Sequence, residues 1–402
     1  MSVPKLRFKE FSGDWVKDNL LSLNEGGFAN GIFNDPKKVG RGYKLVNVLD
    51  MYIDGTIDER RLSLVDIDKT EFNKNKVENG DVFFTRSSLV KEGIAYSNTY
   101  LGQSKDITFD GHLIRMRPKK ALINSTFLNY LLRTSNPRKQ LVERGKTATM
   151  TTIGQSDIAD VKVIYPSLPE QTKIANFLTA VDEKISLLTQ KATLLSQYKK
   201  GVMQQIFSQE LRFKDDDGQE FPEWEEKTLG EIAEINPKTD ILPEEFIYID
   251  LESVEKGILL KETMIRIDNA PSRAQRYLKK EDILFQMVRP YQGNNLFFHL
   301  TGNYVASTGY SQIRTLENPR FLYQYLHLES FTAEVMNRCT GTSYPAINSS
   351  GLAKILVTIP SLPEQTKIAN FLSAIDEKIT INQTQLNTVK QYKQGLLQQM
   401  FV

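Results

Sequence analysis

The chain has 402 residues, a formal net charge of +2 and a hydrophobic fraction of 40%, which is the composition of a globular protein with more than one domain. Its one cysteine, Cys339, excludes an intramolecular disulfide and any zinc site built from several cysteines. The sequence has no run of about 18 apolar residues and no apolar signal core near its start, so we expect a cytoplasmic protein with no membrane contact.

Residues 1–165 form the first predicted domain and carry 26 Lys and Arg residues against 20 Asp and Glu residues. The runs "KLVNV", "DVFFT" and "VKVIY" predict β-strands, because β-branched and aromatic residues dominate them. "STFLNYLLRTS" has the apolar spacing of a helix. We therefore expect a mixed α/β domain whose moderate positive charge suits a polyanionic partner.

Residues 166–210 predict a long helix that begins with "PSLPEQTKIANFL". Ser167 and Glu170 have the spacing of a capping box, and Pro169 lies in the first turn, where its missing N–H costs no hydrogen bond. Apolar residues then recur at alternating steps of four and three, interrupted by Lys199. This spacing indicates a heptad seam, which needs a partner helix.

The second predicted domain, residues 211–359, repeats the frame of the first domain. "LRFK" at 6–9 returns at 211–214, and "GDVFFTRSS" at 80–88 parallels "EDILFQMVR" at 281–289. The residues that follow the second pair of runs differ strongly between the two halves. The duplication therefore conserves the frame and varies the interior.

Residues 360–402 predict a second long helix, because the thirteen-residue segment returns at 360–372 and about 25 of the 42 aligned positions are identical. Its seam is interrupted by Asn382 and Lys393. We expect the two helices to pair, since a solitary helix of this length would expose its apolar stripe; two separate surface helices are the alternative. The predicted fold is α+β, with two mixed α/β domains separated by two long antiparallel coiled-coil helices and a pseudo-two-fold internal repeat.

Motifs for catalysis are absent from the sequence. It contains no P-loop, no glycine-rich dinucleotide-binding motif and no Asn/Asp-Pro-Pro-aromatic motif of an amino-methyltransferase. His112, His299 and His327 are far apart in the sequence and predict no metal site. "DEK" at 182–184 and 376–378 resembles part of a nuclease motif, but its place inside the predicted helices favours an exposed charge cluster. The sequence therefore indicates binding without catalysis.

The pattern P-x-L-x-E-Q-x-x-I-A-x-x-L, found at the end of each dissimilar block, resembles the specificity subunits of type I restriction–modification enzymes. "PKLRFKEFSGDW" and "GDVFFTRSS" are also similar to that family, and the resemblance covers essentially the whole chain. It implies a non-catalytic subunit in which each target-recognition domain reads one half of a split, asymmetric site in double-stranded DNA, while the helices set the spacer.

The same resemblance implies the partners and cofactors of the complex. Two modification subunits would dock on the helices, bind S-adenosylmethionine and methylate adenine. Restriction subunits that use ATP and Mg²⁺ would complete the nuclease. No cofactor is expected in this chain itself.

We expect DNA contacts from cationic, amide and hydroxyl side chains in loops, because these groups bind phosphates and base edges. In the first domain the candidates are Thr85, Arg86, Ser87, Ser88, Arg144, Lys146, Thr147 and Thr149. In the second domain they are Arg273, Gln275, Arg276, Arg289, Tyr291, Gln292, Asn294, Asn295, Ser343 and Tyr344. The candidates for partner docking are Glu170, Gln171, Ile174, Glu364, Gln365 and Ile368.

Three alternatives stay open from the residues alone. The DNA candidates could lie in solvated loops whose arginines pair with carboxylates. The docking candidates could be helix caps or core residues. The chain as a whole could be an enzyme in its own right, or a coiled-coil scaffold that binds only proteins.

Overall fold

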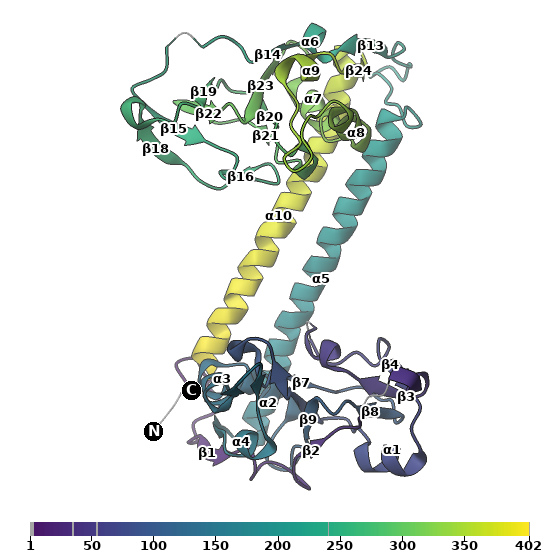
Figure 1. Ribbon diagram of the computed structural model, residues 1–402, viewed down its shortest axis with the longest axis vertical. Helices are drawn as coiled ribbons and strands as arrows, with labels where there is room; N and C mark the ends of the chain where they lie inside the picture. The colour runs from purple at the N-terminus through teal and green to yellow at the C-terminus, as the bar shows by residue number, and fades with distance from the viewer. Residues whose placement is uncertain (1–3, 34–35, 54, 240, 402) are drawn as a thin grey trace. The chain divides into compact units, whose positions relative to one another are not determined.

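The computed structural model describes residues 4–33, 36–53, 55–239 and 241–401 of the chain (Figure 1). It forms two compact units: unit 1 comprises residues 1–189 and 384–402, and unit 2 comprises residues 190–383. Two long helices, α5 (Leu168–Phe207) and α10 (Leu362–Met400), are each divided between the units. The predicted α+β architecture with two mixed blocks and two long helices is confirmed.

Among the described residues, the globular block of unit 1 contains four sheets and four short α-helices. The sheets are β2-β9-β5-β7, β4-β3-β8, β1-β12 and β10-β11-β6. The strands are β1 (Val16–Asn19), β2 (Ala29–Asn30), β3 (Val39–Val46), β4 (Ser63–Val65), β5 (Val82–Thr85), β6 (Ser87–Ser88), β7 (Ser97–Thr99), β8 (Ile107–Phe109), β9 (Leu113–Met116), β10 (Lys146–Thr147), β11 (Thr151–Thr152) and β12 (Lys162–Tyr165). The helices are α1 (Lys69–Asn75), α2 (Ser125–Leu132), α3 (Ser135–Arg144) and α4 (Gln155–Ala159).

The globular block of unit 2 also contains four sheets, ordered β14-β23-β20-β21, β18-β15-β22-β19, β13-β24 and β16-β17. The strands are β13 (Glu225–Thr228), β14 (Ala233–Ile235), β15 (Glu245–Ile249), β16 (Val254–Glu255), β17 (Ile258–Leu259), β18 (Thr263–Arg266), β19 (Ala274–Tyr277), β20 (Ile283–Gln286), β21 (Leu296–Phe297), β22 (Tyr304–Ser307), β23 (Tyr310–Thr315) and β24 (Leu356–Ile359). The helices are α6 (Leu229–Ile232), α7 (Pro319–Tyr325), α8 (Glu329–Asn337) and α9 (Ser349–Ala353).

The two blocks share one strand frame. The antiparallel pair β1·β12 of unit 1 corresponds to β13·β24 of unit 2, and each pair leads directly into a long helix. The sheet β2-β9-β5-β7 corresponds to β14-β23-β20-β21, and the parallel pair β3·β8 corresponds to β15·β22. Unit 2 adds the edge strand β19 to its second sheet. The structure therefore agrees with a duplicated frame whose added segments differ.

The long helices have the heptad seam that the sequence predicts. The apolar positions of the seam are buried or half-buried on both helices, and most positions between them are exposed. In unit 1, Leu178 of α5 and Leu396 of α10 belong to one hydrophobic core. In unit 2, Ile206 of α5 and Leu372 of α10 do the same. Each unit therefore builds its main core from the first half of one helix and the second half of the other, which is an antiparallel pairing.

Polar residues of the seam form two reciprocal ion pairs between the helices. Lys393 Nζ of α10 lies 2.5 Å from Asp182 Oδ1 of α5, and Lys199 Nζ of α5 lies 2.6 Å from Asp376 Oδ1 of α10. The aspartate side chains are only 25% and 38% exposed. The interpretation of these aspartates as members of an exposed charge cluster is therefore wrong, because each one pairs with a seam lysine of the facing helix.

We expect the substitution Asp182→Lys to loosen the helix pair, because it places two ammonium groups together in a half-buried seam. The free energy of unfolding of unit 1 should fall by about 1 to 2 kcal/mol, between the values typical of exposed and buried ion pairs. The double variant Asp182→Lys/Lys393→Asp should recover most of this loss in denaturant unfolding. Glu183→Lys, at the exposed neighbouring position, is the control; an equal effect of this control would contradict a specific pairing.

Candidate nucleic-acid interface

In unit 1, a small sheet joins the two loops that contain the DNA-contact candidates. Strand β11 pairs with β6 on one side, with Thr151 opposite Ser88, and with β10 on the other side, with Lys146 opposite Thr152. The sheet β10-β11-β6 thus places the end of "FFTRSS" beside "RGKTATMTT". Loops that are about 60 residues apart in the sequence share one surface in this unit.

The candidates of unit 1 differ in how far they reach solvent. Exposed side chains are those of Arg86, Lys146, Thr147 and Thr149, and half-buried ones are those of Ser87, Ser88 and Arg144. Lys146 Nζ lies 3.6 Å from Asp157 Oδ2, whereas Arg144 donates only to backbone carbonyl oxygens. Arg86 has no side-chain hydrogen bond or ion pair with any residue that the structure describes. The surface therefore combines exposed cationic and hydroxyl groups, which suit phosphate and base contacts.

Thr85 is withdrawn from the candidate set. Its side chain is fully buried, and its Oγ1 accepts a hydrogen bond of 2.9 Å from the backbone N–H of Tyr96. Strand alternation explains the correction, because Thr85 ends β5 with its side chain directed into the core while Arg86 points outward. Thr85 supports the loop and has no surface to offer to DNA.

In unit 2, backbone contacts join the corresponding loops. Val288 and Ala346 form an antiparallel bridge, and Arg289 N–H donates to Pro345 O at 2.7 Å. Thr340 and Ala346 exchange two backbone hydrogen bonds of 2.9 and 3.0 Å, which close the loop "TGTSYPA". The runs "RPYQGNN" and "GTSYPAIN" are therefore brought together, in the same place on the frame as the joined loops of unit 1.

The edge strand β19 adds a third segment to this surface of unit 2. Thr308 N–H donates to Arg273 O at 2.9 Å, and the adjoining Gly309 O accepts from Met287 N–H at 3.0 Å. The register of β19 shifts between Ala274 and Arg276, so Gln275 lies in a bulge. The segment that contains Arg273, Gln275 and Arg276 is thus linked by backbone contacts to the loop that begins at Met287.

Exposure separates the candidates of unit 2 into three groups. The exposed side chains are those of Arg273, Gln275, Tyr291, Gln292, Ser343 and Tyr344, and the half-buried ones are those of Arg276, Arg289 and Asn294. Asn295 is withdrawn, because it is 2% exposed and its Oδ1 accepts from the backbone N–H of Gln286. Burial lowers the pKa of the Arg276 guanidinium, and its Nε has no partner among the described residues.

His112 also belongs to the surface of unit 1, and sequence reasoning missed it. The backbone N–H of Arg86 donates to His112 O at 2.8 Å, which places the Asp110–His112 turn beside the candidate loop. The imidazole is 66% exposed, and its Nδ1 lies 2.7 Å from Asp110 Oδ1. The signal was the turn sequence "DGH" between two strands, which occupies the same place as Ser307–Gly309 in unit 2.

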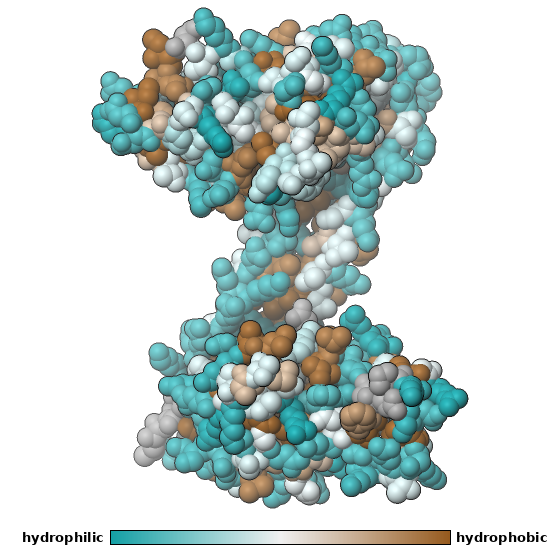
Figure 2. Space-filling view, in the orientation of Figure 1, coloured by the Kyte–Doolittle hydropathy of each residue, from teal (hydrophilic) through white to brown (hydrophobic). Residues whose placement is uncertain are grey.

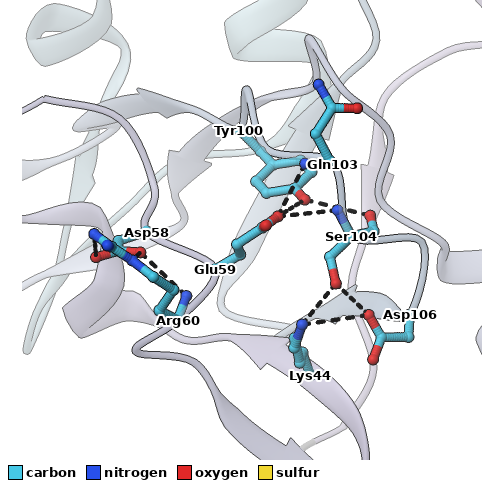
Figure 3. A network of polar contacts seen from close by, with 8 residues as sticks. All are labelled: Lys44, Asp58, Glu59, Arg60, Tyr100, Gln103, Ser104 and Asp106. Carbon is cyan, nitrogen blue, oxygen red and sulfur yellow. Dashed lines mark hydrogen bonds and ion pairs between the residues drawn. The ribbon is translucent and has the colours of Figure 1, made fainter.

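A network of polar contacts in unit 1 surrounds the carboxylate of Glu59 (Figure 3). Glu59 accepts hydrogen bonds from the Tyr100 hydroxyl and from the backbone N–H groups of Gln103 and Ser104, both at 3.0 Å. These bonds lower the pKa of Glu59, while burial and the Glu59 carboxylate raise the pKa of Tyr100. The tyrosine therefore keeps its proton and the carboxylate stays ionised. The network fastens two loops beside a cavity of about 840 Å³ and does not activate a nucleophile.

The structure contains neither a metal-binding cluster nor a membrane-spanning helix in the part of the chain that it describes. No group of three or more His, Cys, Asp or Glu side chains there could hold a metal ion. The described helices include none that is both long and apolar enough to cross a bilayer.

The six docking candidates are all buried: Glu170, Gln171, Ile174, Glu364, Gln365 and Ile368. Glu170 accepts two hydrogen bonds of 2.8 Å from the Arg7 guanidinium, and Glu364 accepts from Arg212 and from Trp224 Nε1. Their side chains are therefore withdrawn as direct contacts, and the core alternative explains them. Ser361 and Glu364 have the same capping-box spacing in the second copy, but this box does not form, because the Ser361 hydroxyl oxygen has no partner among the described residues.

Comparison with known proteins identifies two matching segments. The family described as "Type I restriction modification DNA specificity domain" matches residues 52–197 and 222–391, which together exceed half of the chain. The chain is 25% identical over 411 residues to a putative type I restriction enzyme MjaX specificity subunit of Methanocaldococcus jannaschii, covering 98% of this chain and 94% of that protein. It is 29% identical over 189 residues to the HindI specificity subunit of Haemophilus influenzae, covering 45% and 41%.

Two solved structures share the fold. The S subunit of the type I restriction–modification system of M. genitalium superposes with a TM-score of 0.65 at 17% identity, covering 100% of this chain and 99% of that one. A chain from a study of complex assembly and conformational transition of the type I system gives a TM-score of 0.53 at 15% identity and covers 98% of both chains.

We expect the double substitution Arg86→Ala/Lys146→Ala to weaken binding of the chain to duplex DNA. Each lost phosphate contact reduces the slope of log K against log salt by about 0.9, so the slope should become about 2 units shallower. Fluorescence anisotropy at several salt concentrations measures it. Lys184→Ala, which removes an exposed cation of α5, is the control and should leave the slope unchanged; equal slopes for all three proteins would exclude this surface.

Proposed function

Because the chain belongs to the specificity subunits of type I restriction–modification systems, a family without catalytic activity of its own, we propose that each unit reads one half of a two-part, asymmetric site in double-stranded DNA. The chain is a DNA specificity subunit, and the proposal assigns the two halves of its site to unit 1 and unit 2. The proposed binding to DNA also favours a cytoplasmic location for the protein.

The observation that carries the proposal is a shared position with different side chains. In unit 1, backbone pairing joins the loop after β5 to the loop before α4. In unit 2, it joins the loop after β20 to the loop before α9. Unit 1 presents Arg86 and Lys146 there, whereas unit 2 presents Tyr291 and Tyr344 with its arginines. One frame that places two different sets of groups is what the reading of two different half-sites requires.

The antiparallel helix pair supports the second part of the proposal. Helices α5 and α10 have 40 and 39 residues, so at 1.5 Å per residue each is about 60 Å long, and together they form one paired element. We propose that this element sets the number of base pairs between the half-sites. It would also dock two modification subunits that methylate adenine with S-adenosylmethionine, to which restriction subunits that use ATP and Mg²⁺ would be added.

The proposed docking surface is the exposed face of the duplicated segment, since its buried residues serve the core. Thr172 and Asn176 of α5 are exposed, and so are the identical residues Thr366 and Asn370 of α10. In unit 1 this face borders a largely apolar groove of about 550 Å³, lined by Phe8, Pro169, Thr172, Lys173, Asn176 and Phe177. Packing does not require identity at exposed positions, but two copies of one partner do.

The helices also carry exposed apolar side chains in duplicate. Leu187 and Ile381, at equivalent positions, are 62% and 50% exposed, and Tyr198 and Tyr392 are 53% and 54% exposed. Figure 2 shows hydrophobic side chains at the surface along the long helices. Such side chains favour a protein partner on the helices.

The rival function is a coiled-coil scaffold that binds only proteins. It explains the duplicated helix surface equally well. It does not explain why both blocks place cationic, amide and hydroxyl groups on joined loops at one position of the frame. That position favours DNA readout in addition to protein docking.

We expect Asn176→Arg and Asn370→Arg each to prevent docking of one modification subunit, because each places a long charged side chain on one copy of the proposed surface. The double variant should bind neither subunit. Native mass spectrometry of the co-expressed complex counts the bound subunits. Gln190→Arg is the matched control, because position 190 is exposed and its counterpart, Thr384, differs. Full assembly of the double variant would contradict this surface.

Mapping of methylated adenines tests the proposed readout. The chain is co-expressed with its modification subunits, and residues 1–165 are exchanged for the equivalent block of a relative. We expect only one half of the methylated motif to change, because each block holds its own joined loops. A change in both halves would contradict independent reading, and a motif that is unaffected by the exchange would favour the scaffold.

A further inference from the structure

Arg289 of unit 2 has a strained backbone conformation. Its φ and ψ of 52° and 54° lie in the left-handed region, which a residue with a side chain adopts at a cost. It also precedes Pro290, and residues before proline prefer extended conformations. The conformation is held from both sides, since Arg289 N–H donates to Pro345 O at 2.7 Å and Arg289 O accepts from Gln292 N–H at 3.0 Å.

The buried side chain of Gln286 holds the loop that follows Arg289 in place. The Gln286 side chain, 3% exposed, donates to Val288 O and to Gln292 Oε1 and accepts from the backbone N–H of Asn294. One buried carboxamide thus fastens the loop at three points. Backbone strain that is fixed by such support is typical of sites that must present a group in one orientation.

The Arg289 side chain is positioned by an aromatic ring and has no carboxylate partner within the described ranges of the chain. Its guanidinium carbon lies 4.2 Å from the centroid of the Tyr344 ring, and this ring is 65% exposed. The Nε atom is buried without a hydrogen-bond partner among the described residues. By contrast, Arg314 and Arg338 of the same unit pair with Asp282 and Glu334.

We propose that Arg289 reads a guanine in the half-site of unit 2, with its terminal amino groups donating to O6 and N7 of that base in the major groove. The inference rests on the proposed function, since it needs unit 2 to meet DNA. A guanidinium presents two N–H donors in one plane, and this rigid geometry matches these two acceptors. Tyr344 is a positioning residue, because its ring restricts the guanidinium plane before DNA arrives.

The test uses the full complex with its modification subunits and a duplex that contains its mapped methylation motif. Each guanine of the second half-site is replaced in turn by 7-deazaguanine, which lacks the N7 acceptor. At one guanine, the wild-type complex should bind about 10-fold more weakly or worse. Arg289→Met should bind the normal and the substituted duplex equally, because its side chain has no donor for N7.

Three variants show that any loss is specific. Arg320→Met changes another arginine of unit 2 that lies on an aromatic ring, 5.5 Å from the Phe297 centroid, and should keep the discrimination. Tyr344→Phe keeps the positioning ring and should also keep it, whereas Tyr344→Ala should reduce it at the same guanine. Unchanged discrimination in the first half-site shows that the variant complexes are folded.

Three results would overturn the inference while leaving the proposed function intact. The first two are retained discrimination in Arg289→Met and tolerance of 7-deazaguanine at every position of the second half-site. The third is equal weakening on all duplexes with a shallower salt dependence, which identifies a phosphate contact. Failure of the proposed function is distinct, because the wild-type complex would then show no sequence preference in either half-site.

Discussion

The structure depends on the antiparallel pairing of α5 with α10. Each unit takes its core from both helices. The core of unit 1 contains the start of α5 and the end of α10, and the core of unit 2 contains the start of α10 and the end of α5. Phe401 packs against Phe127 in unit 1 with ring centroids 5.4 Å apart, and Phe207 packs against Phe321 in unit 2 at 5.6 Å. A shift of one helix along the other would break both cores and both interhelical ion pairs together. The register of the helix pair and the stability of both units are therefore a single constraint, which explains why both helices have the same apolar seam.

The buried polar residues of the repeat extend this constraint into the blocks. Gln171 accepts from the backbone N–H of Asn124, whose own side chain caps α2, and it donates to the carbonyl oxygen of Pro166. Gln365 makes the same two contacts with Asn318, which caps α7, and with Pro360. An unpaired carboxamide or carboxylate at these buried positions would cost several kcal/mol. Their identity in the two copies thus follows from internal chemistry, and no partner is needed to explain it.

The sequence alone could not distinguish residues that are repeated for the core from residues that are repeated for a partner. Length, periodicity and duplication were sufficient for the two long helices, the seam and the mixed blocks, because each depends on a pattern that repeats over many residues. Sequence identity could not separate buried residues from exposed ones within the repeat, so Glu170 was predicted as a docking contact although its buried carboxylate accepts from Arg7. Single loop residues were similarly ambiguous: Thr85 and Arg86 are neighbours with similar hydrogen-bonding capacity, and only the direction of strand β5 decides which of them reaches solvent.

The placement of the joined loops explains how such a protein can keep one architecture and change its target. The loops lie at strand ends, outside the hydrophobic cores that hold the helices, so their side chains can vary without disturbing the seam. Their backbones, however, are fastened to the frame by short pairings, as between Thr151 and Ser88 in unit 1 and between Ala346 and Val288 in unit 2. A fixed backbone limits the entropy lost when a side chain meets a base, which favours discrimination over adaptability. If the two units read different half-sites, as proposed, variation in the side chains on a constant backbone would be the physical basis of that difference.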